Sequence, residues 1–203
     1  MGNKQSKKQK FSYGPQFVEM KEGRAKLLMF GAGGVGKTAV TERYILDDYT
    51  DEWDCPTVED SYVKELSVDG EDHVLEILDT GGQEEFAALE DQWIRDADLF
   101  VVMYAISNLE SYEIAEKKIE KIKLFKHDKY CPKGVLLVGN KKDEEEYRQV
   151  TTETAREKAQ IEGISFAEVS AKTGEGVFEM FHDLVRVARD PSYWNKNVKR
   201  AVR

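Results

Sequence analysis

A glycine-rich stretch that ends in lysine and threonine is the clearest candidate for chemistry in this sequence. Residues 31–38 read GAGGVGKT and match GxxxxGK[ST] at every required position. The glycines of such a loop let backbone N–H groups turn toward phosphate oxygens, and the N-terminus of the following helix adds partial positive charge. A plain glycine turn would not require the lysine and threonine, so we interpret the stretch as a phosphate site. The expected phosphate-binding residues are Gly31, Gly33, Gly34, Val35, Gly36, Lys37, Thr38 and Ala39.

Two residues of this loop have specific expected roles. Lys37 would reach the β- and γ-phosphates and stabilise the charge that develops during phosphoryl transfer. The Thr38 hydroxyl would coordinate Mg²⁺. The motif alone indicates only a nucleotide phosphate, so kinases, ATPases and GTPases all remain open at this point.

The tetrad NKKD at 140–143 bears on which base is bound. It follows the apolar run GVLLVG, so it lies at the carboxyl end of an expected strand, where open α/β sheets bind ligands. The Asp143 carboxylate can accept both the N1–H and the 2-amino group of guanine. Adenine lacks those donors and would leave the carboxylate unpaired, which would weaken nucleotide binding. Asn140 can brace the loop, and the Lys141 stem can lie along the base.

A second short motif strengthens the case for guanine. In isolation, NKKD before DEEEY is more typical of a solvated acidic turn. SAK at 170–172 follows another expected strand, and the Ala171 backbone N–H is placed to donate to guanine O6. Ser170 and Lys172 complete this part of the expected site. Tyr49 could pack edge-on against the base, although an ordinary half-buried tyrosine is equally compatible with its position.

The stretch DTGGQEEF at 79–86 supplies candidates for the reaction itself. Asp79 is a candidate water-mediated partner of Mg²⁺, and the Gly82 backbone N–H can meet a γ-phosphate. Gln83 could orient an attacking water, which is the role of such a glutamine in phosphoryl transfer. The alternative, a surface glutamine in an acidic loop, is outweighed by the presence of the other motifs. The two catalytic candidates are therefore Gln83 and Lys37.

PTVEDSY at 56–62 completes the set of motifs. Thr57 offers a hydroxyl to Mg²⁺ and a backbone N–H to the γ-phosphate. Both contacts weaken after hydrolysis, so the loop can be ordered or released by the nucleotide state. Thr38, Thr57 and Asp79 are thus the expected metal-site residues. Trp53 could cover the phosphates or be an ordinary half-buried aromatic residue.

The elements that would position these motifs are apolar strands alternating with helices. This alternation predicts a mostly parallel sheet covered on both faces. The sequence DGED between two strand-like runs predicts a hairpin. Expected strands cover 24–31, 61–68, 73–79, 99–105, 134–140 and 164–170, and expected helices cover 37–47, 109–127, 151–162 and 175–189.

Composition restricts the class of protein. The 203 residues carry a formal net charge of −9, which argues against broad nucleic-acid binding. Residues 1–10 and 191–203 contain lysine or arginine but no aspartate or glutamate, which suggests contacts with an anionic surface. Two cysteines give neither a disulfide framework nor a paired metal spacing, and we expect a reducing, intracellular compartment. No apolar run is long enough to span a membrane.

Taken together, the motifs resemble those of small GTPases of the Ras family, in the family's order and spacing over roughly 24–190. The resemblance implies a P-loop G domain with a six-stranded, mostly parallel sheet and five helices. It also implies Mg²⁺-dependent binding of GTP and GDP, slow GTP hydrolysis, and switch segments near 48–60 and 80–95. Implied partners are an exchange factor, a GTPase-activating protein and effectors, which would contact the first switch and its edge strand, 59–66. We expect a monomer.

Three departures from the family pattern affect these expectations. Cys55 is an extra residue before Pro56, so specific effectors are not carried over. Gly81 stands where the family usually has alanine, which bears on the hydrolysis rate. The sequence ends VKRAVR, without a prenylation cysteine. An interaction module that binds nucleotide with little turnover is therefore the main alternative.

The N-terminal residues suggest where the protein works. MGNKQS fits the N-myristoylation pattern, with Gly2 as the acceptor. One myristoyl chain gives an association constant of only about 10⁴ M⁻¹, and nearby lysines would add to it on an anionic leaflet. We expect a flexible basic extension over 1–23, a G domain over 24–190 and a basic tail over 191–203. We expect the protein at the cytoplasmic face of a membrane, with the plasma membrane as the first candidate. A fraction of the protein would be cytosolic. A plain basic tail is the alternative.

Overall fold

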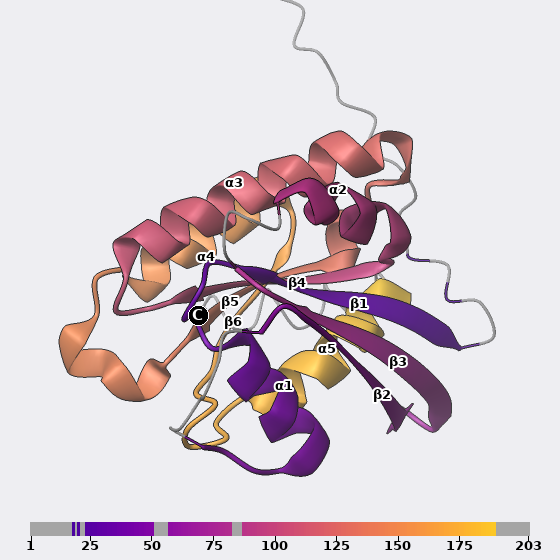
Figure 1. Ribbon diagram of the computed structural model, residues 1–203, viewed down its shortest axis with the longest axis horizontal. Coiled ribbons are helices and arrows are strands. Elements are labelled where there is room, and N and C mark those ends of the chain that lie inside the picture. The colour runs from indigo at the N-terminus through magenta and orange to yellow at the C-terminus, as the bar shows by residue number, and fades with distance from the viewer. Residues whose placement is uncertain (1–17, 19, 21–22, 51–56, 83–86, 190–203) are drawn as a thin grey trace, which may run out of the picture.

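The computed structural model describes residues 18, 20, 23–50, 57–82 and 87–189. At its centre lies one sheet of six strands in the order β2-β3-β1-β4-β5-β6 (Figure 1). All neighbouring strands are parallel except β2 and β3, which form an antiparallel pair. The strands are β1 (Arg24–Gly31), β2 (Glu59–Val68), β3 (Glu71–Thr80), β4 (Leu99–Ala105), β5 (Val135–Asn140) and β6 (Ser165–Glu168).

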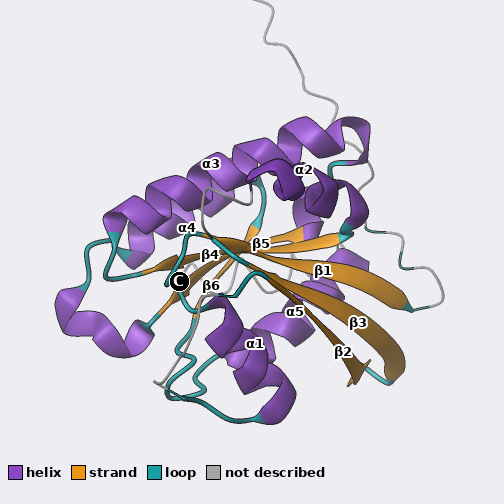
Figure 2. Cartoon of the chain, in the orientation of Figure 1, coloured by secondary structure: helices purple, strands orange, loops and turns teal. Residues whose placement is uncertain are grey.

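Helices cover both faces of this sheet (Figure 2). One core cluster joins the sheet to the first and last helices, and a second joins it to the three others. Every residue of β4 and β5 is buried, which is why these strands read as continuous apolar runs. The helices are α1 (Lys37–Leu46), α2 (Ala87–Asp96), α3 (Leu109–Lys126), α4 (Thr152–Glu162) and α5 (Val177–Arg189).

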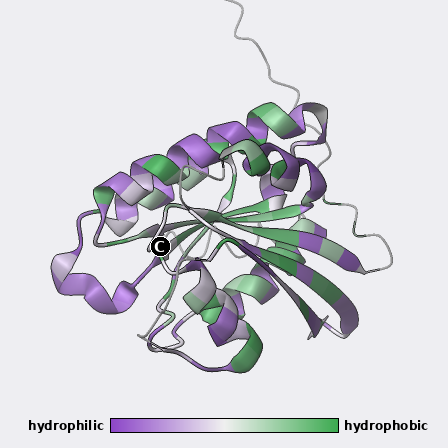
Figure 3. Cartoon of the chain, in the orientation of Figure 1, coloured by the Kyte–Doolittle hydropathy of each residue, from purple (hydrophilic) through white to green (hydrophobic). Residues whose placement is uncertain are grey.

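Hydropathy follows the same layers. Figure 3 shows apolar residues concentrated in the central strands, and polar and apolar residues alternating along α3. No helix among the described residues has the length and apolar character needed to cross a bilayer.

The expected hairpin between β2 and β3 is confirmed. Val68 pairs with Glu71 across a two-residue turn. Asp69 and Gly70 have φ values of 54° and 84°, as a type I′ turn requires. The Asp-Gly pair is among the best sequences for this turn, because both residues tolerate the left-handed region.

The predicted fold class is confirmed, with shifts at element boundaries. Strand β6 ends at Glu168 because the next residues turn toward other loops: Val169 O accepts from the Lys142 N–H at 3.0 Å. Helix α5 begins only at Val177, after Gly174 and Gly176 in left-handed conformations. Helix α2 was not among the expected helices. Short 3₁₀ helices also occur at His127–Lys129, Pro132–Gly134 and Lys142–Tyr147.

The chain enters and leaves the sheet at one pole. The Val18 N–H donates to Ala188 O at 3.0 Å, so the residues before β1 meet the end of α5. Val18 and Met20 pack against the core, although both fall within the stretch 1–23 that we expected to be flexible. This pole lies opposite the carboxyl ends of the parallel strands, where the sequence motifs are found.

Candidate functional site

The glycine-rich loop between β1 and α1 has a backbone that only glycine accommodates at key positions. Gly31 has a φ of 149°, and a Cβ there would lie 2.3 Å from Met103 O. Gly36 has a φ of 91°, and a Cβ there would lie 2.4 Å from the Asn140 side-chain nitrogen. The loop is therefore shaped by close approach to the neighbouring strands, and the Gly33 and Gly34 backbone remains exposed. Exposed, bent backbone of this kind can turn N–H groups toward an anion.

Lys37, the first residue of α1, is held inside this loop. Its ammonium donates to Ala32 O at 2.8 Å and to Gly31 O at 3.2 Å, and the residue is buried. Burial lowers its pKa to about 8, against the opposing influence of the Asp79 carboxylate. An anionic ligand in the loop would favour the charged form of this lysine.

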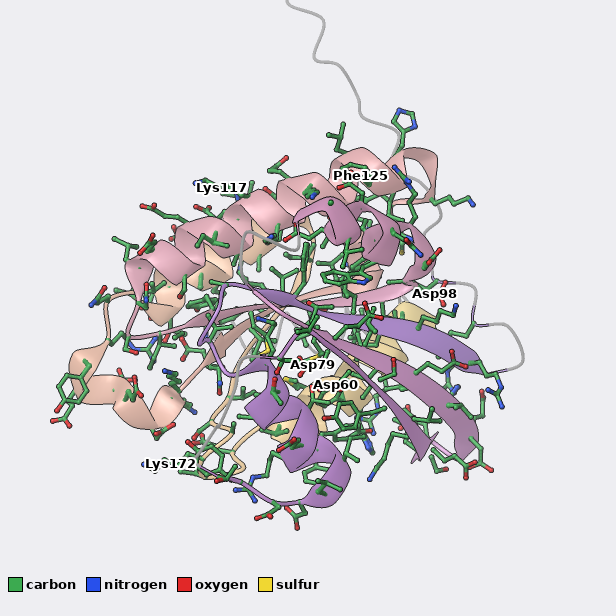
Figure 4. The ribbon with its side chains drawn as sticks, viewed as in Figure 1. Asp60, Asp79, Asp98, Lys117, Phe125 and Lys172 are labelled. Carbon is green, nitrogen blue, oxygen red and sulfur yellow. The ribbon has the colours of Figure 1, made fainter. Side chains whose placement is uncertain are left out.

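Three side-chain oxygens from separate parts of the chain meet beside Lys37. The Thr38 hydroxyl lies 2.7 Å from the Thr57 hydroxyl and donates to Asp79 Oδ2 at 2.5 Å. Asp79 is fully buried at the end of β3, next to α1 (Figure 4). Its other oxygen, Oδ1, has no hydrogen-bond partner among the described residues. Hydroxyl and carboxylate oxygens are the ligands that Mg²⁺ prefers, and an unpaired buried oxygen fits a cation or its bound water.

The electrostatic environment of Asp79 also fits a cation bound beside its carboxylate. Burial raises its pKa to about 6, although the Thr38 hydrogen bond and the Lys37 charge act in the opposite direction. A carboxylate that is this costly to ionise in the ligand-free protein would be stabilised by a nearby cation.

The NKKD and SAK segments meet on the other side of the loop. The Asn140 side chain donates to Val35 O at 2.9 Å and accepts from the Ala171 N–H at 3.2 Å. It therefore braces the glycine-rich loop against the SAK segment. Asp143 Oδ1 accepts from the Ser170 hydroxyl at 2.5 Å, which orients the carboxylate.

Sequence reasoning missed Arg43, on α1. Its guanidinium donates to Ala171 O at 2.9 Å and to Lys172 O at 3.1 Å. The same guanidinium lies 5.8 Å from the centre of the Tyr49 ring. Arg43 therefore fixes both the SAK segment and the tyrosine that we expected near the base. A single arginine on the polar side of a helix gives no sequence signal for such contacts.

Strand register explains why distant motifs converge. Met29 lies opposite Asp79, and Ala105 lies opposite Asn140. The sequence motifs therefore come at the carboxyl ends of neighbouring strands and lie on the same side of the sheet. A Cβ on Gly82 would lie 2.3 Å from the Gly33 nitrogen, which places the start of the DTGGQEEF loop against the glycine-rich loop.

The remaining expected residues differ in how the structure places them. Ala39 packs into the core, so any contact it makes with a ligand would come from its backbone. Lys141 has a φ of 65° at the start of the 3₁₀ helix Lys142–Tyr147. Lys172 lies in the loop before α5 (Figure 4). The predicted roles of Gln83, Trp53, Cys55 and Gly2 fall outside the described residues.

Comparison with protein families agrees with this arrangement. The sequence pattern of the Ras family matches residues 26–190, which is most of the chain. The matched region contains the five nucleotide-site motifs, GAGGVGKT, PTVEDSY, DTGGQEEF, NKKD and SAK, and ends one residue after α5. The chain therefore belongs to the Ras family, whose members are small GTPases that bind GTP and GDP.

Proposed function

We propose that this chain is a switch that binds GTP or GDP together with Mg²⁺ and hydrolyses GTP slowly. The observation that carries the proposal is the meeting of Thr38, Thr57 and Asp79 beside the buried Lys37 ammonium. These residues come from α1, from the segment before β2 and from β3, so a phosphate-bound cation would link the glycine-rich loop to both switch segments.

The metal site would be formed by the two hydroxyls, with the carboxylate behind them. Thr38 and Thr57 would hold Mg²⁺, and Asp79 would orient its bound water through Oδ1, which no described residue hydrogen-bonds. When bound, the cation supplies charge neutralisation at the β- and γ-phosphates. Lys37 would turn its ammonium from the loop carbonyls to the same phosphate oxygens.

Gln83 would position the attacking water, and the Gly82 N–H would meet the γ-phosphate. Ten residues separate the end of α1 at Leu46 from Thr57, which is too few for an inserted domain carrying a catalytic arginine. We therefore expect intrinsic hydrolysis at about 10⁻⁴ to 10⁻³ s⁻¹ and stimulation by an activating protein that supplies the arginine.

Base selection would come from Asp143. Its carboxylate would accept the N1–H and 2-amino group of guanine, and Asn140 and Ser170 hold the surrounding loops in place. The Ala171 N–H, now bonded to Asn140, is the expected donor to O6.

Partners and location form a further part of the proposal. Exchange factors, activating proteins and effectors would contact the first switch and β2, which is an edge strand carrying the exposed side chain of Val63. Acylation of Gly2 and the adjacent lysines would place the protein on an anionic membrane face. The contact between Val18 and Ala188 supports a membrane pole opposite the switches.

The test is nucleotide binding and single-turnover hydrolysis by the full chain. We expect GTP and GDP to bind far more tightly than ATP, and EDTA to accelerate nucleotide release. Slow phosphate production with GTP supports the switch. Tight binding without turnover would favour the nucleotide-bound interaction module, the alternative that Gly81 and Cys55 suggest. Equal affinity for ATP and GTP would contradict the proposal as a whole.

A further inference from the structure

Arg43, in the second turn of α1, bonds to two separate parts of the chain with one side chain. Its guanidinium donates to Ala171 O at 2.9 Å and to Lys172 O at 3.1 Å, both in the SAK segment. A third bond, to Asp47 O at 3.1 Å, reaches the residue that caps α1. The Arg43 side chain is 16% exposed, so these carbonyls replace water around most of the charged group. Arginine suits such a place because its planar fork holds several donors in fixed directions.

The same guanidinium lies beside an aromatic ring. Its central carbon is 5.8 Å from the centre of the Tyr49 ring, a distance at which a cation is attracted to the ring. Tyr49 is two residues beyond the cap of α1 and packs against the core. Arg43 thus joins the segment after α1 to the SAK segment, in which Lys172 is labelled in Figure 4. These two segments carry residues that we expect beside the base.

Ala171 is held on both sides of its backbone. Its N–H donates to Asn140 Oδ1 at 3.2 Å, and its carbonyl accepts from Arg43. The N–H is the group that the proposed function assigns to guanine O6. Removing the Arg43 guanidinium would take the charged donor from the carbonyl side of this residue. The direction of the Ala171 N–H would then be less firmly fixed.

We propose that Arg43 is a positioning residue for guanine and that it slows release of the nucleotide. Its bonds hold the Ala171 N–H in place for O6, and its contact with Tyr49 keeps that ring beside the base. The inference rests on the proposed function, in which these groups meet guanine. It goes further because it assigns control of nucleotide release to a residue outside all five motifs. Helix α1 would then serve the phosphates through Lys37 and the base through Arg43.

A purely structural role for Arg43 would be to end α1. Its bond to Asp47 O is typical of a basic side chain near the C-terminus of a helix. The Asp47 carboxylate adds little, because it lies 3.8 Å from the guanidinium and its side chain is 79% exposed. Ending the helix would affect every bound nucleotide equally. Positioning of the Ala171 N–H would depend on which atom the base carries at position 6.

The first measurement is the release of GDP, labelled with a fluorophore on its ribose, from the full chain in Mg²⁺. Arg43→Ala should accelerate release about thirtyfold, because hydrogen bonds to a charged group contribute more than neutral ones. Arg43→Lys should still release GDP about tenfold faster than wild type, since an ammonium does not reproduce the fork of donors. The matched control is Asp47→Asn, in which asparagine tolerates the left-handed backbone at this position, with a φ of 55°. This control should change release by less than about twofold.

Analogues of GDP test whether Arg43 acts at O6. In 6-thio-GDP a sulfur, which is a weaker acceptor, replaces O6, while the N1–H and 2-amino donors remain. Arg43→Ala should accelerate release of 6-thio-GDP only about threefold, through the loss of the contact with Tyr49. Inosine diphosphate keeps O6 and lacks the 2-amino group that Asp143 would accept. Its release should therefore be accelerated about thirtyfold, as for GDP, because the two contacts are independent.

The outcomes separate this inference from the proposed function. A wild-type chain that does not bind GDP would overturn both. GDP binding with unchanged release in Arg43→Ala would overturn the role of Arg43 alone. Equal acceleration for GDP, inosine diphosphate and 6-thio-GDP would also overturn it, because only the helix-ending role would remain. So would equal acceleration in Asp47→Asn.

A second pair of variants covers the case in which Arg43→Ala does not fold. Arg43→Lys and Arg43→Gln keep a polar side chain of similar length, and both are compared with wild type on GDP and 6-thio-GDP. The acceleration for GDP should exceed that for 6-thio-GDP by at least about threefold in each variant. A ratio near one in both variants would overturn the proposal.

Discussion

Asp79 should limit the stability of the protein when nucleotide and Mg²⁺ are removed. Its pKa is about 6 in the folded chain, compared with 3.8 for the ordinary carboxyl group. A difference of about two pKa units lowers the free energy of unfolding by roughly 3 kcal/mol at pH 7, where the carboxyl group is ionised in both the folded and the unfolded state. We therefore expect Asp79→Asn to stabilise the stripped protein at pH 7 by about 2 kcal/mol, allowing about 1 kcal/mol for an imperfectly paired amide.

The sign of the pH dependence follows from the raised pKa. Between pH 3.8 and about 6 the folded chain binds more protons at Asp79 than the unfolded chain does. The contribution of this group to stability is therefore largest at low pH and is lost as the pH rises through about 6. Lys37, whose pKa is lowered to about 8, titrates above this window.

Urea unfolding of the EDTA-stripped protein between pH 5 and 8 measures this effect. The wild-type protein should gain stability from pH 7 to 5 relative to Asp79→Asn, whereas Asp72→Asn, an exposed position on the same strand, should follow the wild type. In Mg²⁺ and GDP the order should reverse, because the variant loses the carboxylate that supports the cation. If wild type and Asp79→Asn have parallel pH profiles, the reasoning about the buried carboxylate is refuted.

Four further predictions concern recognition, turnover and location. Asp143→Asn should weaken GTP binding and improve binding of xanthine nucleotides, whose 2-carbonyl accepts from the amide; an unchanged preference in a competition assay would remove Asp143 from the base site. Gln83→Leu should lower stimulated hydrolysis far more than GTP affinity, and intact stimulated turnover would argue against the water-positioning role. Gly2→Ala should abolish N-terminal acylation and move most of the protein to the soluble fraction, as judged by intact mass and membrane fractionation. Replacing Lys4, Lys7, Lys8 and Lys10 by glutamine should keep the acyl group and weaken binding to anionic vesicles.

Helix α2 shows where sequence reasoning stops. Its ten residues, AALEDQWIRD, directly follow the DTGGQEEF motif and were not among the helices expected from the sequence, and Glu90 reads as a surface charge. Glu90 is buried, and the lysines of α3 that pair with it, Lys118 and Lys121, lie 28 and 31 residues later in the chain. Burial of a charge depends on partners brought together by folding, so a local pattern does not reveal it.

The sequence motifs and apolar runs were enough to predict the fold class, which the structure confirms, and to propose the residues of the candidate site. Contiguous motifs such as GAGGVGKT and NKKD carry their own chemistry, and apolar runs identify the strands that end beside them, because phosphate and base contacts come from short segments of chain. The contacts that couple these segments to one another became visible in the folded chain alone. The bonds of Arg43 to two carbonyls of the SAK segment, the hydrogen bond from Thr38 to Asp79 and the attachment of α2 to α3 are contacts between residues far apart in the chain. Their geometry follows from strand order and helix packing, which local propensities do not encode.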